Sequence, residues 1–373
     1  MTAAGLIFSN IHDKCIPEMT SRRTMASLPF GGRYRLVDFT LSNMVNSGIN
    51  KVGIVTHNNY RSLMDHIGNG KDWDLARRSG GIMILPPFVT AYENPRANQL
   101  YTTRLEALMG VREYITHCDE DVIVLSDSDV VANIDLRPVI RQHEESGADI
   151  TLVYKRSEVF REKKCAALFF NECGKLLDLY LNPELEGTQN IYLDIAIIKK
   201  PLLDELIAEC ASKNEHSFVN SVLMQKKGVL NIRGYLFDGY CNKLTGLRNY
   251  LDASLALLQP EVRKSLFPAE RPIYTRVRDQ VSAKYGENAK VSESLVTDGC
   301  HVDGEIEKTV LFRGATVEKD AKVKGCVLMH NTFVGEGCDL QWVITDKNVV
   351  IPAGTHLAGS EKYPLYIPKD TVL

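Results

Sequence analysis

The sequence has no apolar run long enough to cross a membrane. A spanning helix needs ~18–20 apolar residues, and no stretch of the 373 residues reaches that length. A charge excess is also lacking, because 44 basic and 47 acidic residues leave a formal net charge of −3. We therefore expect neither a membrane nor nucleic acid as a partner. Residues 1–10 lack the basic and long apolar regions of a signal peptide, which predicts a cytoplasmic protein.

Cysteine pairs of the Cys-x-x-Cys kind are missing as well. The nine cysteines follow no regular spacing, which argues against the usual zinc and disulfide frameworks. We interpret them as reduced thiols in packed positions. Hydrophobic residues make up 44% and charged residues 24% of the chain. These values are typical of a globular protein, and the length favours two domains.

The chain shows two different sequence patterns, one in its first part and one in its last part. Residues 1–258 alternate short apolar strands with amphipathic helices, with strands expected at 4–8, 51–56, 121–125 and 149–154 and helices at 62–67, 99–115, 136–145 and 247–258. This alternation predicts a three-layer α/β domain around a mostly parallel sheet. Such sheets bind ligands beyond the carboxyl ends of their strands. We therefore expect a site formed by residues 8–14 and 126–129.

A second periodicity starts near residue 288, after a connector over 259–287. Branched apolar residues recur six positions apart, with glycines between them: Val296 and Val302; Leu311, Val317 and Val323; Leu328, Val334 and Leu340; Ile344 and Val350. This step predicts a left-handed parallel β-helix over 288–373, with the apolar residues pointing inward. An antiparallel sheet is the alternative, but hairpins need no fixed six-residue step. We expect His301 and His330 to face solvent, and the coil cysteines to fill its core.

One run is more specific than any other: Ser27-Leu-Pro-Phe-Gly-Gly-Arg-Tyr-Arg-Leu-Val-Asp-Phe-Thr-Leu-Ser-Asn-Met-Val-Asn-Ser-Gly-Ile49. It resembles the segment after the phosphate loop of the ADP-glucose pyrophosphorylases, also called glucose-1-phosphate adenylyltransferases. Further similar segments lie at 62–75, 80–87, 272–275, 283–285, 310–314 and 343–351. The resemblance covers nearly the whole chain. It implies a Rossmann-like nucleotidyltransferase domain followed by the β-helix.

Members of this family transfer the adenylyl group of ATP to glucose 1-phosphate and release pyrophosphate. Because the protein does little covalent work in such a transfer, positioning and charge neutralisation carry the catalysis. The family uses a glycine-rich loop and basic residues for the phosphates, two carboxylates for Mg²⁺, and a cation for the sugar phosphate. The resemblance implies that this chain has lost all four devices.

The phosphate loop and its basic residue differ first. The family pattern Gly-Gly-x-Gly-x-Arg corresponds here to residues 10–15. Its three glycines and its arginine are replaced by Asn10, Ile11, Asp13 and Cys15. Glycines let the backbone approach phosphate closely, whereas Ile11 adds bulk and Asp13 adds negative charge. Met25 stands where the family has a phosphate-binding lysine, and Thr103 stands where a glycine admits the nucleotide.

The metal and sugar-phosphate positions differ next. The metal-binding aspartate of the family corresponds to Ser128, although a slip of one residue would restore Asp127 or Asp129. The second metal-binding aspartate corresponds to Lys243, which cannot ligate Mg²⁺ because the ion demands oxygen ligands. Two further positions differ. Asn182 stands where the family has the lysine that binds the sugar phosphate, and Asp194 stands where the family has a glycine near the sugar.

These losses predict a non-catalytic or weakly active regulatory subunit of the GlgD type, which the family pairs with a catalytic subunit for glycogen synthesis. We expect a catalytic paralogue as partner in a heterotetramer, a homo-oligomer as an option for the chain alone, and Mg²⁺ only in the paralogue. Two alternatives stay open. One is an active enzyme with a rearranged metal site on Asp127, Asp129 and Asp238. The other is a stand-alone sensor of sugar phosphates or nucleotides.

Three arginines match positions that bind anionic effectors in the family, namely Arg22, Arg23 and Arg35. Guanidinium forks suit phosphate esters, so fructose bisphosphate, AMP and inorganic phosphate are the expected effectors. The alternative is that these arginines are solvated or pair with nearby acids. The family's histidine between them is Pro29 here, and the effector partners from the C-terminal region cannot be placed from the sequence.

Overall fold

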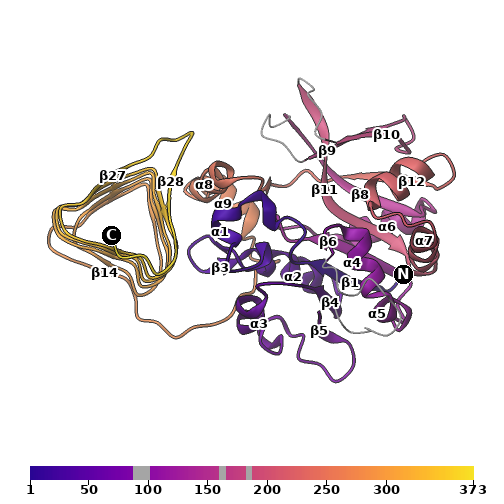
Figure 1. Ribbon diagram of the computed structural model, residues 1–373, viewed down its shortest axis with the longest axis horizontal. Helices are drawn as coiled ribbons and strands as arrows, with labels where there is room; N and C mark the ends of the chain where they lie inside the picture. Colours follow the sequence, from indigo (N-terminus) through magenta and orange to yellow (C-terminus); the bar gives the residue numbers. More distant parts are fainter. Residues whose placement is uncertain (87–100, 159–164, 182–186) are drawn as a thin grey trace.

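The computed structural model describes residues 1–86, 101–158, 165–181 and 187–373. These residues form an α/β domain and, beside it, a coil of short strands (Figure 1). The helices are α1 (Pro17–Thr20), α2 (Leu36–Asn46), α3 (Arg61–Ile67), α4 (Arg104–Gly110), α5 (Arg112–Thr116), α6 (Leu136–Glu145), α7 (Lys200–Ser212), α8 (Leu247–Ala256) and α9 (Pro260–Leu266). Three short 3₁₀ turns are η1 (Asp13–Cys15), η2 (Met25–Ser27) and η3 (Lys71–Trp73), and η4 (Phe218–Met224) is a π-helix.

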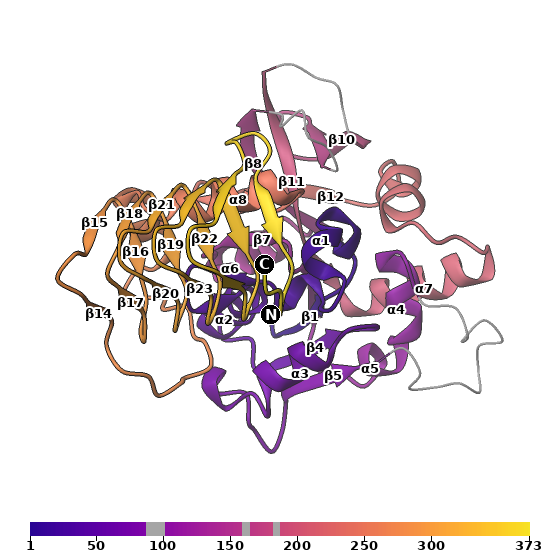
Figure 2. The same ribbon diagram turned by 60° about the vertical axis from the view of Figure 1, so that its left-hand side comes forward.

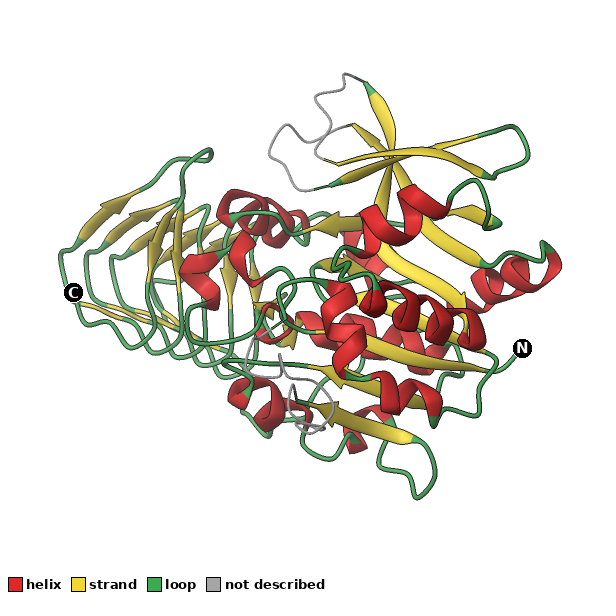
Figure 3. Cartoon of the chain, turned by 45° about the vertical axis from the view of Figure 1, so that its right-hand side comes forward, coloured by secondary structure: helices red, strands yellow, loops and turns green. Residues whose placement is uncertain are grey.

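A nine-stranded sheet forms the centre of the α/β domain (Figure 3). Its strands are β1 (Ala3–Phe8), β4 (Lys51–Val55), β5 (Gly81–Leu85), β6 (Val122–Asp127), β8 (Ile150–Glu158), β9 (Ala166–Phe170), β10 (Leu176–Leu181), β11 (Thr188–Lys199) and β12 (Ile232–Leu236). The main order is β10-β9-β11-β6-β1-β4-β5, with β8 between β11 and β12. Strands β6, β1, β4 and β5 are parallel, which confirms the expected parallel core. Strand β11 runs antiparallel to β6, β8 and β9, an extension that the sequence pattern did not predict.

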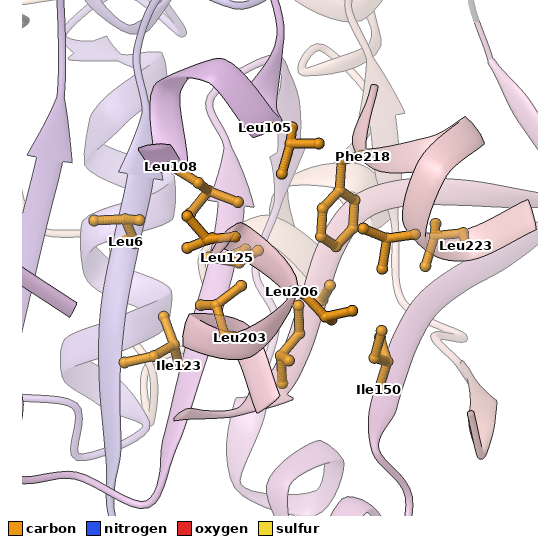
Figure 4. Close-up of a cluster of buried hydrophobic side chains, with 14 of the residues drawn as sticks. Leu6, Leu105, Leu108, Ile123, Leu125, Ile150, Leu203, Leu206, Phe218 and Leu223 are labelled. Carbon is orange, nitrogen blue, oxygen red and sulfur yellow. The ribbon is translucent and has the colours of Figure 1, made fainter. Parts of the chain in front are cut away.

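Side chains of the buried strands alternate between two hydrophobic cores. Leu6 and Leu125 lie on one face, against residues of α4 and α7 (Figure 4). Ile7 and Val124 lie on the other face, against residues of α2, α3 and α6. Helices therefore cover both faces of the sheet, which confirms the three layers. The helix expected over 99–115 is α4 followed by α5, with Val111 between them, and its first residues lie outside the described ranges.

The carboxyl ends of two central strands meet at one edge of the sheet. Phe8 of β1 is in register with Asp127 of β6, so the segments that follow both strands lie next to each other. A small ladder adds a third segment, because β13 (Cys241–Lys243) pairs with β7 (Val130–Ala132) and brings Lys243 opposite Val130. This edge holds most of the positions that the sequence singled out.

The second domain is a parallel β-helix, as expected. Three sheets of five parallel strands form a coil of triangular cross-section, whose turns are stacked in Figure 2. Their strands are β14 (Lys284–Tyr285), β15 (Lys290–Ser292), β16 (Leu295–Val296), β17 (His301–Val302), β18 (Glu305–Glu307), β19 (Val310–Leu311), β20 (Thr316–Val317), β21 (Lys322–Lys324), β22 (Val327–Leu328), β23 (Phe333–Val334), β24 (Asp339–Gln341), β25 (Val343–Thr345), β26 (Val350–Ile351), β27 (His356–Ala358) and β28 (Leu365–Ile367). Val302, Val317 and Val334 are fully buried and stack in one column, while Cys300, Cys326 and Cys338 fill the core.

The two domains share one hydrophobic core. Phe30, Tyr250 and Leu257 of the first domain pack in a single cluster with Phe312 and Met329 of the β-helix. A two-stranded ribbon, β2 (Pro29–Phe30) and β3 (Tyr34–Arg35), lies at this junction. Because the core is continuous, the surfaces that the two domains turn toward each other are held in a fixed relation. In the described part of the chain, no helix has the length and apolarity needed to cross a membrane.

Candidate functional site

Six charged side chains gather where β1 and β6 end. We call them the ion cluster: His12, Arg104, Asp127, Asp129, Asp194 and Lys243. They come from the segment after β1, the start of α4, the end of β6, β11 and β13. The ligating atoms of the histidine and the three aspartates lie within 4.8 Å of one another. The cluster thus occupies the position at which the sequence predicted the ligand site.

Arg104 is the centre of the ion cluster. Its Nη2 atom lies 2.6 Å from Oδ2 of Asp127 and 3.0 Å from Oδ1 of Asp194, and its Nε atom donates to Oδ1 of Asp127 at 3.2 Å. The guanidinium also lies over the rings of Phe8 and Tyr192. Burial lowers the pKa of Arg104, but Asp127 more than offsets this and raises it. Arg104 is therefore a permanent buried cation between two carboxylates.

His12 and Lys243 supply the other two positive charges. The His12 Nε2 atom lies 2.6 Å from Oδ2 of Asp127 and 3.6 Å from Oδ2 of Asp129. Burial lowers the pKa of His12, but Asp129 and Asp127 outweigh burial and raise it to about 10, so the imidazole is protonated at neutral pH. The Lys243 ammonium contacts Asp194 and lies 3.6 Å from Oδ2 of Asp129. Three cations thus face three carboxylates.

The pKa of Asp127 reflects this environment. Burial raises the pKa of the carboxyl, but Arg104 and His12 lower it far below its usual range. Asp194 has a positive φ of 56° at an irregularity in the pairing of β11 with β8. A left-handed backbone at this position fits the glycine that the family resemblance implied. Here the aspartate side chain adds a carboxylate that reaches both Arg104 and Lys243.

The residues of the ion cluster do not fit a magnesium site. Mg²⁺ needs near-octahedral oxygen ligands at ~2.0–2.1 Å and keeps several waters. In this cluster, the side chains of Arg104 and Lys243 bond the carboxylates that would serve as ligands. The rearranged site on Asp127, Asp129 and Asp238 is not assembled either, because Asp238 is exposed and is not part of the group of ligating atoms around Asp127 and Asp129.

The segment that replaces the phosphate loop is closed by its own side chains. Oδ1 of Asn10 accepts hydrogen bonds from the backbone N of His57 and from Oγ1 of Thr56, both at 3.0 Å. Nδ2 of Asn10 donates to Oδ2 of Asp13 at 2.7 Å, and Oδ1 of Asp13 accepts from the backbone N of Met25 at 2.7 Å. Burial raises the pKa of Asp13 to about 6. Side chains of this segment thus fill the space that glycines would leave open for phosphate, and they bind donors of neighbouring segments.

The other sequence-predicted positions lie around this segment. Ile11 packs against a hydrophobic core, and Met25 is fully buried. Cys15 is partly buried. Ser128 is buried and turns away from the ion cluster, because its Oγ donates to the carbonyl oxygen of Phe8 at 3.2 Å. Asn182 lies outside the described residues.

A second site lies between the two domains. We call it the cationic cleft, a cavity of about 270 Å³ lined by Arg33, Tyr34, Arg35, His66, Arg276, Arg278, Gln280, Arg313, His330, Asn331, Lys347, Asn348 and Lys369. Seven of these residues are basic and none carries a carboxylate. Among the described residues, carboxylates pair with some of the lining groups: Asp298 binds Arg33 at 2.6 Å, Asp370 lies 3.3 Å from Lys369, and the buried Asp38 lies 2.6 Å from Nε2 of His66. Such a surplus of positive charge at a concave surface favours an anionic ligand.

Electrostatic repulsion is visible in the pKa values of the cleft. Burial, followed by Arg35 and Arg23, lowers the pKa of Lys347 to about 7 despite the neighbouring Asp346. Burial and Lys347 lower the pKa of His330 to about 2, so this imidazole is neutral. Burial also lowers the pKa of Arg35 to about 10. An anion bound in the cleft would stabilise the charged form of each of these groups.

The three arginines that the sequence proposed for an effector are dispersed. Arg35 lines the cleft and donates from Nη1 to Oγ of Ser62 at 2.9 Å. Arg23 is buried and binds Oδ2 of Asp346 at 2.5 Å, which ties the first domain to the β-helix. Arg22 is exposed, 3.9 Å from Oδ2 of Asp370. The structure therefore places only Arg35 in the cleft, and Arg23 pairs with an acid, as the alternative reading allowed.

Sequence reasoning missed most of the cationic cleft and, in the ion cluster, Arg104. His330 is only partly exposed, because it lines the cleft and its ring lies tilted against that of Phe312, with ring centroids 5.3 Å apart. The pair Arg276 and Arg278 was a detectable signal in the connector. Arg104 gave no signal of its own, since a lone arginine at the start of a helix is unremarkable.

The architecture defines a class: a sugar nucleotidyltransferase-type α/β domain followed by a hexapeptide β-helix. Comparison with protein-family models agrees, since residues 16–191 match "Nucleotidyl transferase" and residues 279–362 match "GlmU-like, C-terminal hexapeptide". The second match accords with the left-handed hand expected for the β-helix.

Individual relatives narrow the class. The glycogen biosynthesis protein GlgD of Bacillus subtilis (strain 168) is 33% identical over 374 residues, covering 99% of this chain and 96% of the relative. The GlgD protein of Geobacillus stearothermophilus is 31% identical, and the match covers 99% of this chain and 96% of that protein. The glucose-1-phosphate adenylyltransferase of Clostridium perfringens (strain SM101) is 28% identical, and the match covers 95% of this chain and 91% of that protein. The chain therefore belongs to the family of the glucose-1-phosphate adenylyltransferases, or ADP-glucose pyrophosphorylases, and the GlgD proteins.

Proposed function

We propose that the chain is a regulatory subunit of glucose-1-phosphate adenylyltransferase with little or no turnover of its own, and that it supports glycogen biosynthesis in the cytoplasm. The observation that carries this proposal is the ion cluster. Adenylyl transfer needs Mg²⁺ and free cations for the phosphates of both substrates. In this chain, the cations at the equivalent edge are bound to carboxylates of the protein itself.

The closed segment over residues 10–15 supports the same proposal. A triphosphate would have to break the hydrogen bonds of Asn10 and Asp13 and approach the carboxylate of Asp13. Removing a buried hydrogen-bonded group from its partners costs about 1–3 kcal/mol for each one left unsatisfied. Productive nucleotide binding is therefore disfavoured by packing as well as by charge.

The cationic cleft is the proposed regulatory site. Its ligand would be a phosphorylated metabolite or inorganic phosphate, because phosphate oxygens can accept from several guanidinium groups at once. The lining comes from β3, α3, the connector and four turns of the β-helix region. A ligand held there would contact both domains and could change how the chain acts on a partner.

The proposed partner is a catalytic member of the same family. Within such a heterotetramer, Mg²⁺ and the substrates would bind in the catalytic subunit. Exposed apolar side chains of the β-helix include Tyr285 and Phe333 on one of its sheets and Val291 on another. Exposed apolar positions of this kind are available for subunit contacts.

A three-way assay tests the proposal. Pyrophosphate release from ATP and glucose 1-phosphate is measured for this chain alone, for a catalytic relative from the same organism alone, and for the two co-expressed, with and without fructose bisphosphate, AMP or inorganic phosphate. We expect no release above background from the chain alone and a changed rate or effector response in the mixture. Turnover by the chain alone at the rate of its relative would overturn the proposal. Failure of the two chains to co-purify would favour a stand-alone sensor.

A further inference from the structure

The three carboxylates of the ion cluster are not equally satisfied. Asp127 accepts from Arg104 and lies against His12, and Asp194 binds Arg104 and Lys243. Asp129 is 1% exposed, and in the described part of the chain neither of its oxygens has a hydrogen-bond partner. Among the described residues, the charges that face Asp129 are those of His12 and Lys243, each at 3.6 Å.

An unpartnered carboxylate at such depth is costly unless a positive charge compensates it. Two protein cations provide that charge here, at a distance too long for a hydrogen bond. A metal ion coordinated by the same ligating atoms would sit at ~2.0–2.6 Å from oxygen. The three aspartates therefore converge on one position, and the ammonium of Lys243 lies among them.

We propose that the ion cluster is a masked cation site, in which Lys243, aided by Arg104, takes the place of a divalent metal ion. Three carboxylates surround the position, and carboxylate oxygens suit Mn²⁺ and similar divalent ions. The protein thus carries a built-in counterion that keeps this edge of the sheet assembled without metal or nucleotide. The inference goes beyond the proposed regulatory role, because it would hold for a sensor as well.

The cluster also explains why this edge is held together. Its members join five segments that are far apart in sequence: residues 12, 104, 127–129, 194 and 243. The left-handed φ of Asp194, 56°, is an uncommon state for a residue other than glycine. Its contacts with Arg104 and Lys243 offset that cost.

Removal of the Lys243 charge should therefore unmask the site. Mn²⁺ is titrated into the full-length chain while free Mn²⁺ is followed by electron paramagnetic resonance. We expect no saturable binding by the wild type up to millimolar Mn²⁺. Lys243→Ala should bind one Mn²⁺ with a Kd of about 0.1–1 mM, the range of weak protein sites for divalent ions. Adding Asp129→Asn to Lys243→Ala should abolish the binding.

A matched control and a stability readout complete the experiment. Lys199 also pairs with an aspartate, Asp149 at 3.0 Å, but lies away from the cluster. Lys199→Ala should bind no Mn²⁺. Thermal unfolding should show a lower Tm for Lys243→Ala without metal and a rise on adding Mn²⁺ that the wild type lacks. If Lys243→Ala does not fold without metal, folding that depends on Mn²⁺ supports the proposal, and Lys243→Gln, which keeps the side-chain length, is titrated in its place.

Two results would overturn the inference. One is saturable Mn²⁺ binding by the wild type that Asp129→Asn removes, since the site would then be open. The other is a folded Lys243→Ala or Lys243→Gln chain that binds no Mn²⁺. Neither result depends on pyrophosphate release, so a failure here leaves the regulatory proposal standing, and turnover in the three-way assay leaves this test unaffected.

Discussion

Lys347 links anion binding in the cationic cleft to pH. In the free protein, burial and the neighbouring arginines lower the pKa of Lys347 to about 7, so about half of the molecules carry this charge at neutral pH. A bound dianion would offset the repulsion and raise the pKa of the ammonium toward its ordinary value of ~10.4. Binding should therefore be accompanied by uptake of about half a proton at pH 7 and about 0.9 at pH 8.

The sign of the pH dependence follows from this shift. Because the pKa of Lys347 is higher in the bound state, affinity is greatest below pH 7 and falls as the pH rises above 7, by about tenfold per unit. The other titratable groups facing the cleft do not obscure the effect. Burial keeps the pKa of His66 below its usual value and that of His330 at about 2, so both are neutral above pH 7. Arg35, with a pKa of about 10, stays charged.

Sulfate is the probe of choice, because it remains a dianion across this pH range whereas phosphate itself titrates. Isothermal titration at pH 6.5–8.5, in two buffers of different ionisation enthalpy, measures both affinity and proton uptake. Lys347→Met should weaken binding about 10- to 150-fold at pH 6.5, the ~1.5–3 kcal/mol of a charged hydrogen bond, and should abolish proton uptake. Lys322→Met, on an exposed β-helix position outside the cleft, should change neither. A sulfate affinity that is independent of pH, or proton uptake that persists in Lys347→Met, would refute the reasoning.

Three further substitutions test the buried charges. Arg104→Met leaves Asp127 and Asp194 without their shared cation, so the free energy of unfolding measured in urea should fall by about 3–5 kcal/mol; a loss below 1 kcal/mol would show that the pairing is dispensable. Arg23→Met leaves Asp346 without its cation, so the free energy of unfolding should fall in the same way. Adding Asp346→Asn to Arg23→Met should restore part of that free energy. If the effects of the two single substitutions simply add, the two side chains do not form a direct pair. Asp13 contributes stability that is lost as the pH rises from about 4 through its folded pKa of about 6, since burial raises that pKa above the unfolded value. Asp13→Asn should flatten this part of the pH–stability profile followed by thermal unfolding, and an unchanged profile would contradict the assignment.

Much of the fold was predictable because its signals are local. The apolar strand at 121–125 and the helix at 136–145 correspond to β6 (Val122–Asp127) and α6 (Leu136–Glu145) in the structure. The six-residue step of the β-helix reflects one short strand and one turn, so it appears directly in the sequence. Strand β11 could not be placed in this way, because its antiparallel pairing with β6 depends on contacts between residues about 70 positions apart.

The sequence by itself determined the fold class and the absence of the glycine loop, because both depend on residue type and spacing within one segment. Only the tertiary structure decided what replaced the lost devices. Arg104 and Lys243 are ordinary in sequence. They become counterions of Asp127 and Asp194 because Asp194, in the middle of β11, lies beside the end of β6, while the start of α4 and the end of β13 bring the two cations to the same place. The cleft likewise exists because a shared core seats the β-helix against the first domain, which brings basic residues from 33 to 369 together. Electrostatic energy depends on distance in space, and only folding sets that distance.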